Sequence, residues 1–224
     1  MPRLSLAPAL LTAACMFCAA PAQATLIGGV EFPQGAVSFA DAVVSYSPIL
    51  VSGNPSDPHR GASNALGVPN YTGVNGCASQ ADCSFVSLGD GGSLVVQFID
   101  NRLTGSGNAS LDLWIFEVGP DVEDTFVDIS KDGTTWLSVG KVGGSTAGVD
   151  IDAFGYTAAD LFAYVRLRDD PDLDGQSGAT VGADIDAIGA ISTVATPVPE
   201  PGTFALMAVG LAGLFAARRS AHRR

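Results

Sequence analysis

The sequence predicts an all-β fold, an antiparallel two-sheet β-sandwich of the jelly-roll class, flanked by an N-terminal signal helix and a C-terminal single apolar helix. Helical periodicity is almost absent between residues 25 and 195. Short apolar or alternating segments recur there, separated by Gly, Asp and Asn, and this pattern is typical of strands joined by turns. An apolar stretch at each end divides the chain into residues 1–24, the ectodomain 25–196, and residues 197–224.

Several ectodomain segments have the length and apolar content of strands, and some alternate in part between apolar and polar residues, as half-buried strands do. One short helical turn is expected at Thr157–Asp160. Gly89–Gly92 is expected to form a hairpin turn rather than a phosphate-binding loop, because no helix follows it. The predicted strands are Asp41–Tyr46, Phe85–Leu88, Ser93–Ile99, Leu111–Val118, Thr125–Ser130, Trp136–Val139, Phe162–Arg168 and Ile185–Ser192.

The N-terminal segment has the three parts of a secretory signal peptide. Arg3 supplies the basic region, residues 6–20 are mostly apolar, and an A-x-A cleavage site precedes Thr25. We therefore expect export, with Thr25 as the first residue of the mature chain. The alternative is lipidation at Cys15 or Cys18, but neither cysteine follows a suitable triplet.

The C-terminal segment carries a proline-bounded apolar stretch followed by basic residues. Residues 203–217 are apolar, and this run of 15 is shorter than the roughly 20 residues that span a bilayer. The basic residues behind it favour a cytoplasmic position for this end of the chain. The motif comprises, in order, Pro199, Glu200 and Pro201, the apolar run, and Arg218 and Arg219.

This order of parts resembles the PEP-CTERM sorting signal of Gram-negative bacteria. The resemblance implies a transient inner-membrane anchor, which an exosortase, a membrane-embedded cysteine protease, recognises and removes. It also implies a final location at the cell surface or in the extracellular matrix, in association with exopolysaccharide or biofilm. The alternative is an ordinary C-terminal membrane helix.

The charge of the ectodomain excludes nucleic acid as a partner. Residues 25–196 include six basic and 22 acidic residues, which give a net charge of −16. Binding to a phosphate backbone needs a basic face. Dense aspartate instead favours solubility and hard cations such as Ca²⁺.

The two cysteines of the mature chain, Cys77 and Cys83, lie in a segment rich in Gly, Ser and Asn. In an oxidising compartment, such a close pair favours a structural disulfide. The alternative, a redox role, would more often use the spacing C-x-x-C. The surrounding residues 47–84 are mostly irregular, and a loop of this length is usually functional or ordered by a ligand.

A strand, a turn and a tryptophan follow one another at Phe126–Trp136, with the pattern S-x-D-G-x-x-W. Asp132–Gly133 fits a tight turn that needs positive φ, and Trp136 is expected to pack on the edge of the sandwich. Together with Tyr164–Leu167, this pattern resembles the second half of discoidin and galactose-binding-like jelly-roll domains. The resemblance covers about residues 85–192. It implies a fold often used for glycan recognition, without identifying the ligand-binding residues.

An acidic turn that begins at Asp170 has the pattern D-x-D-x-D-G of calcium loops, in which alternating carboxylates converge and glycine permits a sharp bend. Its twelfth position is Val181 rather than Glu, so the loop is not an EF-hand. The alternative is a solvated acidic turn, in which no ion relieves the repulsion between like charges. The predicted calcium ligands are Asp170, Asp172, Asp174, Asp184 and Asp186.

A second acidic set lies at and after the end of a predicted strand and comprises Glu117, Asp121, Glu123 and Asp124. Two of these carboxylates could form a glycosidase acid and base, contact a cation, or serve only as surface charge. The mature ectodomain has one histidine, His59, and no G-x-S-x-G sequence. These absences argue against a serine hydrolase and against a histidine-based zinc site.

The sequence thus predicts a non-enzymatic, exported protein of the cell surface or extracellular matrix, whose calcium-stabilised β-sandwich binds carbohydrate or exopolysaccharide. The expected partners are the exosortase and the polysaccharide, and the expected cofactor is Ca²⁺. One alternative is a structural envelope or biofilm-matrix component without a specific ligand. A minor alternative is a polysaccharide hydrolase that uses Glu117 or Glu123.

Overall fold

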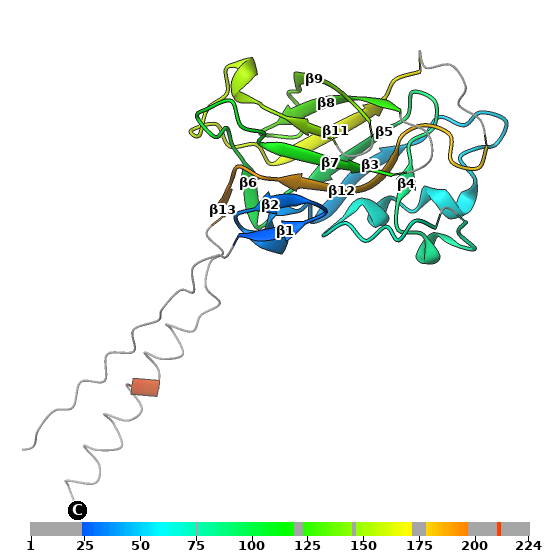
Figure 1. Cartoon of the computed structure of the whole chain (residues 1–224), viewed down its shortest axis with the longest axis horizontal. Helices are drawn as coiled ribbons and strands as arrows, with labels where there is room; N and C mark the ends of the chain where they lie inside the picture. The colour runs from blue at the N-terminus through cyan, green and yellow to red at the C-terminus, as the bar shows by residue number, and fades with distance from the viewer. Residues whose placement is uncertain are drawn as a thin grey trace, which may run out of the picture.

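Two antiparallel sheets face each other and form a β-sandwich (Figure 1). The computed structural model describes residues 24–74, 76–118, 123–144, 147–171, 178–196 and 210–211. Short 3₁₀ helices occupy the connections: η1 Gly35–Ser38, η2 Asp57–Arg60, η3 Ala62–Ala65, η4 Gln80–Asp82 and η5 Asp152–Phe154. Within the described part of the chain, no helix is long and apolar enough to cross a membrane.

The larger sheet has five strands in the order β3-β5-β11-β8-β9, with β11 at its centre. Alternation along β11 explains its position, because Val165 and Leu167 are fully buried and the residues between them lie on the outer face. The strands are β3 Ala42–Ser47, β5 Ser93–Gln97, β8 Asp124–Ser130, β9 Leu137–Gly143 and β11 Tyr164–Asp169.

The smaller sheet has four strands in the order β10-β7-β12-β4. Every residue of β12 is buried, which requires cover on both faces of the sheet. The strands are β4 Val86–Ser87, β7 Leu113–Glu117, β10 Ala147–Val149 and β12 Asp184–Ala190. Two further antiparallel pairs join β1 Thr25–Ile27 to β2 Val30–Phe32, and β6 Asn101–Leu103 to β13 Thr193–Ala195.

The main core fills the space between the two sheets. Both sheets contribute fully buried aliphatic side chains, including Leu94 and Ile129 from the larger sheet and Ile185 and Ile188 from β12. A smaller cluster of Phe32, Phe39, Phe116 and Ala187 lies apart from this core. It packs the β1-β2 pair against the outer face of the smaller sheet, so the first residues after the expected cleavage site are part of the fold (Figure 1).

All of the predicted strands are confirmed, with ends that shift by a few residues and with β4 reduced to two residues. The short strands β1, β2, β6, β10 and β13 were not predicted. Gly89–Gly92 does form a turn, in which Gly92 N donates to Gly89 O at 3.0 Å. It is not a hairpin, however, because β4 pairs with β12 and β5 pairs with strands of the other sheet. The predicted signal helix and nearly all of the C-terminal helix lie outside the described residues.

Candidate functional site

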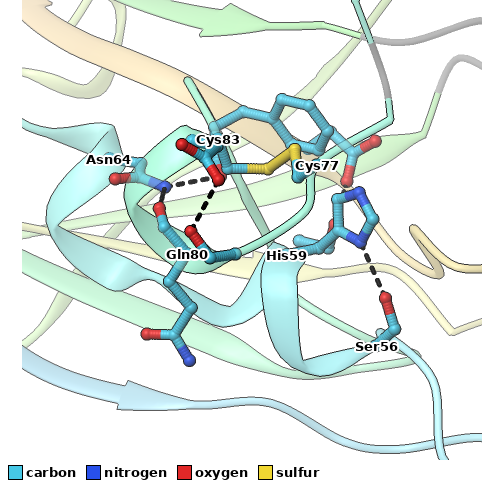
Figure 2. Close-up of a disulfide and its surroundings, with 11 residues drawn as sticks. Ser56, His59, Asn64, Cys77, Gln80 and Cys83 are labelled. Carbon is cyan, nitrogen blue, oxygen red and sulfur yellow. Dashed lines mark hydrogen bonds between the residues drawn. A yellow bond between two sulfur atoms is a disulfide. The ribbon is translucent and has the colours of Figure 1, made fainter.

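Several contacts hold the long connection that includes residues 47–84. Cys77 and Cys83 form the predicted disulfide, with a Cα–Cα distance of 5.2 Å (Figure 2). His59 is buried, stacks on Phe85 with 5.5 Å between ring centroids, and lies 2.9 Å by its Nδ1 from Ser56 Oγ. The single histidine of the ectodomain therefore has a structural role in this loop.

Asp186 attaches this loop to the smaller sheet. Its carboxylate accepts hydrogen bonds from the backbone N–H groups of Asn70 at 3.0 Å and Tyr71 at 3.2 Å. The side chain is buried, and burial raises the pKa of Asp186 although the two N–H donors oppose that shift. Asp186 therefore anchors the loop, and its assignment as a calcium ligand stays a prediction.

The remaining described acids of both predicted sets come together at one end of the sandwich. Five strand ends meet there, because β7 and β11 end where β8 and β12 begin, and β4 ends beside them. We call this region the acidic end, and it comprises Glu117, Glu123, Asp124, Asp169, Asp170 and Asp184. The sequence placed these residues in separate patterns, and sheet pairing unites them.

Lys141 bridges two acids on the outside of the acidic end. Its Nζ lies 2.6 Å from Asp124 and 2.7 Å from Asp170, while Asp170 N donates to Asp124 O at 3.0 Å. Hydrogen bonds to Asp124 and then Asp170 raise the pKa of Lys141. The first residue of the predicted calcium loop is therefore held by a protein cation.

Asp169, next to Asp170 in the chain, connects two backbone segments through its carboxylate. Its carboxylate accepts hydrogen bonds at 2.8 Å from Gly91 N and from Ala183 N, and so joins the turn before β5 to the segment before β12. The two segments touch closely, because a Cβ at Gly182 would overlap the Gly89 backbone oxygen, and Gly182 also has φ of +76°. This tight packing fixes the positions of the neighbouring carboxylates.

Glu117 is the most unusual acid of the group. It is only 4% exposed, and neither of its carboxylate oxygens has a hydrogen-bond partner in the described structure. Burial, together with the nearby carboxylates of Glu123 and Asp184, raises the pKa of Glu117 to about 9. Burial also raises the pKa of Asp184 well above its usual range, although the Ser87 hydroxyl donates to this carboxylate. Glu117 and Asp184 are thus both buried, and the partly buried Glu123 lies close enough to raise the pKa of each.

Several predicted residues cannot be placed. Asp121, Asp172 and Asp174 lie outside the described residues, as do all parts of the predicted sorting motif, namely Pro199, Glu200, Pro201, Arg218 and Arg219. Of the five predicted calcium ligands, Asp170 and Asp184 both belong to the acidic end.

A second region of interest lies on the outer face of the larger sheet. The Arg166 guanidinium stacks on the half-buried Trp136 ring at 4.5 Å from its centroid, and Arg168 lies 5.3 Å from the centroid of Phe126. One oxygen of Asp128 accepts from Arg166 Nε at 3.0 Å and from Arg168 Nε at 3.1 Å, and lies 2.9 Å from Arg166 Nη2. We call Phe126, Asp128, Trp136, Arg166 and Arg168 the open face.

The predicted turn holds Trp136 at the rim of the open face. Thr134 N and Thr135 N both donate to Asp132 Oδ1 at 2.8 Å, and Gly133 has φ of +75°. This confirms the turn and the position of Trp136 near the sheet edge. The two arginines were not predicted as site residues, although their spacing of two along a strand places them on one face.

Comparisons with known proteins support the sorting signal. Residues 197–220 match the family model described as the PEP-CTERM protein-sorting motif, as predicted. This motif implies an exported protein that exosortase processes during membrane-anchored sorting to the cell surface. A comparison with curated protein sequences finds no match.

Two solved structures with a similar fold come from bacteria. The chain is similar to "CpGH89CBM32-6 produced by Clostridium perfringens", with a TM-score of 0.32 and 13% identity, over 47% of this chain and 72% of that chain. It is also similar to the C-terminal domain of a chitobiase from Bacteroides fragilis, with a TM-score of 0.35 and 14% identity, over 73% of this chain and 97% of that chain. Both similarities concern the fold alone.

Proposed function

We propose that this exported surface protein is a non-enzymatic carbohydrate-binding module of the extracellular matrix, and that it binds polysaccharide on the open face. The observation that carries the proposal is the Trp136 ring with Arg166 stacked on it and Asp128 holding that arginine. This group combines an aromatic surface with fixed polar atoms on an accessible side of a rigid sheet.

The chemistry of the open face matches the surface of a sugar. A pyranose ring presents apolar C–H groups, which pack on aromatic rings, and hydroxyls, which need oriented donors and acceptors. Arg166 and Arg168 donate, and Asp128 fixes both guanidinium groups. Because strands β8 and β11 hold these groups before binding, little conformational entropy is lost when the ligand arrives.

Calcium at the acidic end is the second part of the proposal. Glu117, Glu123 and Asp184 provide only hard oxygen ligands, which Ca²⁺ prefers, and the loop that follows Asp170 would complete the shell. Support comes from the buried Glu117 carboxylate, whose oxygens have no hydrogen-bond partner among the described residues. An ion there would stabilise the sandwich rather than contact the sugar, because the open face lies on the outer side of the larger sheet.

Burial makes Glu117 a poor candidate for hydrolysis. A raised pKa suits a general acid, but Glu117 is only 4% exposed, and a glycosidic oxygen must reach the acid that protonates it. We therefore assign Glu117 to ion binding. Turnover of polysaccharide that disappears in Glu117→Gln would contradict this assignment.

The open face is tested by binding of the mature chain to a printed glycan array in calcium buffer. Wild type is expected to retain a subset of glycans, and Trp136→Ala should weaken that binding by more than about tenfold. Phe154→Ala is the matched control, because Phe154 is 47% exposed and lies outside the open face. The proposal fails if Trp136→Ala binds as well as wild type, or if wild type retains no glycan.

A further inference from the structure

Three aspartates meet at the end of the sandwich opposite the acidic end. Asp112 precedes β7, Asp150 follows β10, and Asp152 begins η5. One carboxylate oxygen from each lies within 4.8 Å of the others. Asp112 and Glu117 stand at opposite ends of β7, about 17 Å apart at the usual rise of a strand. The two acidic groups are therefore separate.

Asp112 provides an independent indication of a ligand. It is fully buried, and its Oδ2 accepts from Ile151 N at 2.9 Å. Its Oδ1 is also buried and accepts no hydrogen bond of normal geometry in the described structure. Burial raises the pKa of Asp112, and the nearby Ser192 and Ser106 hydroxyls only oppose that shift. A buried carboxylate oxygen without a donor is costly unless a cation or water satisfies it.

No protein cation balances this group. None of the three aspartates forms an ion pair within the described residues. Asp152 is wrapped by a glycine-rich segment, in which Ser106 N donates to Asp152 Oδ2 at 2.8 Å. A Cβ at Gly105 would lie 2.9 Å from Asp152 Oδ1, so this segment fits closely around the carboxylate.

We propose that Asp112, Asp150 and Asp152 bind a calcium ion. The ligands are all hard oxygens from carboxylates, and backbone carbonyls or waters complete the six to eight positions that Ca²⁺ takes. Sites of this composition on extracellular modules bind with Kd of about 10⁻⁴–10⁻³ M. The site therefore fills after export, when the chain meets external calcium.

The position of the ion gives it a mechanical role. The backbone oxygen of Asp112 accepts from Ile191 N at 2.7 Å and from Ser192 N at 3.1 Å. These residues lead into β13, the last strand before the sorting motif at residues 197–220. An ion on Asp112 holds the segment that joins the folded domain to its C-terminal signal.

Calorimetric titration of the mature chain with Ca²⁺ tests this site. Asp150→Asn should bind one ion fewer than wild type, or bind that ion more than about tenfold more weakly. Asp112→Asn should have the same effect on Ca²⁺ binding. If Asp112→Asn does not fold because Asp112 is buried, Asp150→Asn still provides the test. Glu117→Gln is the matched control, because it should leave this binding event intact while it affects the acidic end.

Amide exchange supplies a second readout that the acidic end does not influence. Ca²⁺ should slow exchange at Ile191 and Ser192 in wild type and in Glu117→Gln, and this slowing should be lost in Asp150→Asn. The inference is overturned if Asp150→Asn binds as many ions as wild type with equal affinity. It is also overturned if these amides do not respond to Ca²⁺.

Discussion

The open face and the acidic end both bury carboxylates, but they treat the charge in opposite ways. The Asp128 side chain is 5% exposed and is held by two arginines. Glu117 is 4% exposed and has no hydrogen-bond partner in the described structure. Burial alone therefore does not indicate a metal site. A buried carboxylate that is paired with a protein cation has its negative charge balanced. A buried carboxylate without such a partner must instead bind a proton or a metal ion.

The largest expected effect is a pH dependence that belongs to the acidic end. Without metal, the pKa of Glu117 rises from 4.5 in the unfolded chain to about 9 in the folded protein. The folded state then binds more protons across that window, so the free energy of unfolding falls as pH rises through it. The slope from one such group reaches about 1.4 kcal/mol per pH unit. Urea unfolding in chelator at several pH values measures it.

Glu117→Gln is the control for that dependence, since it removes the titrating group at nearly constant shape. The variant should be more stable than wild type at pH 8 in chelator, and its stability should vary less with pH. An unchanged slope would mean that Glu117 is not the group responsible.

The next effect concerns the open face. Asp128→Ala leaves Arg166 and Arg168 without their shared carboxylate, and this loss should cost about 3 kcal/mol of unfolding free energy. The effect should be the same in calcium and in chelator, because the acid already has protein partners. Chemical denaturation in the two buffers checks both statements. If the loss of unfolding free energy in Asp128→Ala depended on Ca²⁺, the open face and the acidic end would not differ in their need for an ion.

The disulfide loop gives a smaller effect. Replacing Cys77 and Cys83 by Ala should cost about 2 kcal/mol, since the closed loop is short. The response to Ca²⁺ should not change, because the acidic end lies elsewhere. Thermal unfolding with and without Ca²⁺ tests this, and a lost calcium response would couple the two regions.

The smallest effect comes from the exposed side of the acidic end. Asp124 and Lys141 are both partly exposed, with side-chain exposures of 31% and 38%. Asp124→Asn should therefore change the unfolding free energy by less than about 1 kcal/mol, in contrast to Asp128→Ala. Denaturant titration of both variants in one buffer makes the comparison, and equal losses would refute it.

The sequence predicted those parts of the molecule in which local pattern decides structure. The strand that became β11 was evident, because its apolar residues alternate and Val165 and Leu167 are fully buried. Strands β1 and β13 were not evident, because three residues are too few for a period and their pairing depends on the rest of the fold. The disulfide was predictable from spacing and compartment.

The candidate sites depended on long-range pairing and were predicted only in part. Asp184 and Asp186 are two residues apart, yet one belongs to the acidic end and the other anchors Asn70 and Tyr71. No local pattern separates them. Asp112 and Asp152 are 40 positions apart, and only the pairing of β7 with β10 brings them together.

The most direct test of the account is the calcium dependence of unfolding at the acidic end, measured in an Asp150→Asn background so that the second site does not contribute. At Ca²⁺ of about 100 times Kd, the parent should gain roughly 2.7 kcal/mol over chelator. Mg²⁺ should give less, because it demands a smaller octahedral shell. Adding Glu117→Gln should abolish most of the gain, and adding Asp128→Asn should preserve it. A gain no larger than the effect of ionic strength, or one that survives Glu117→Gln, would contradict the account.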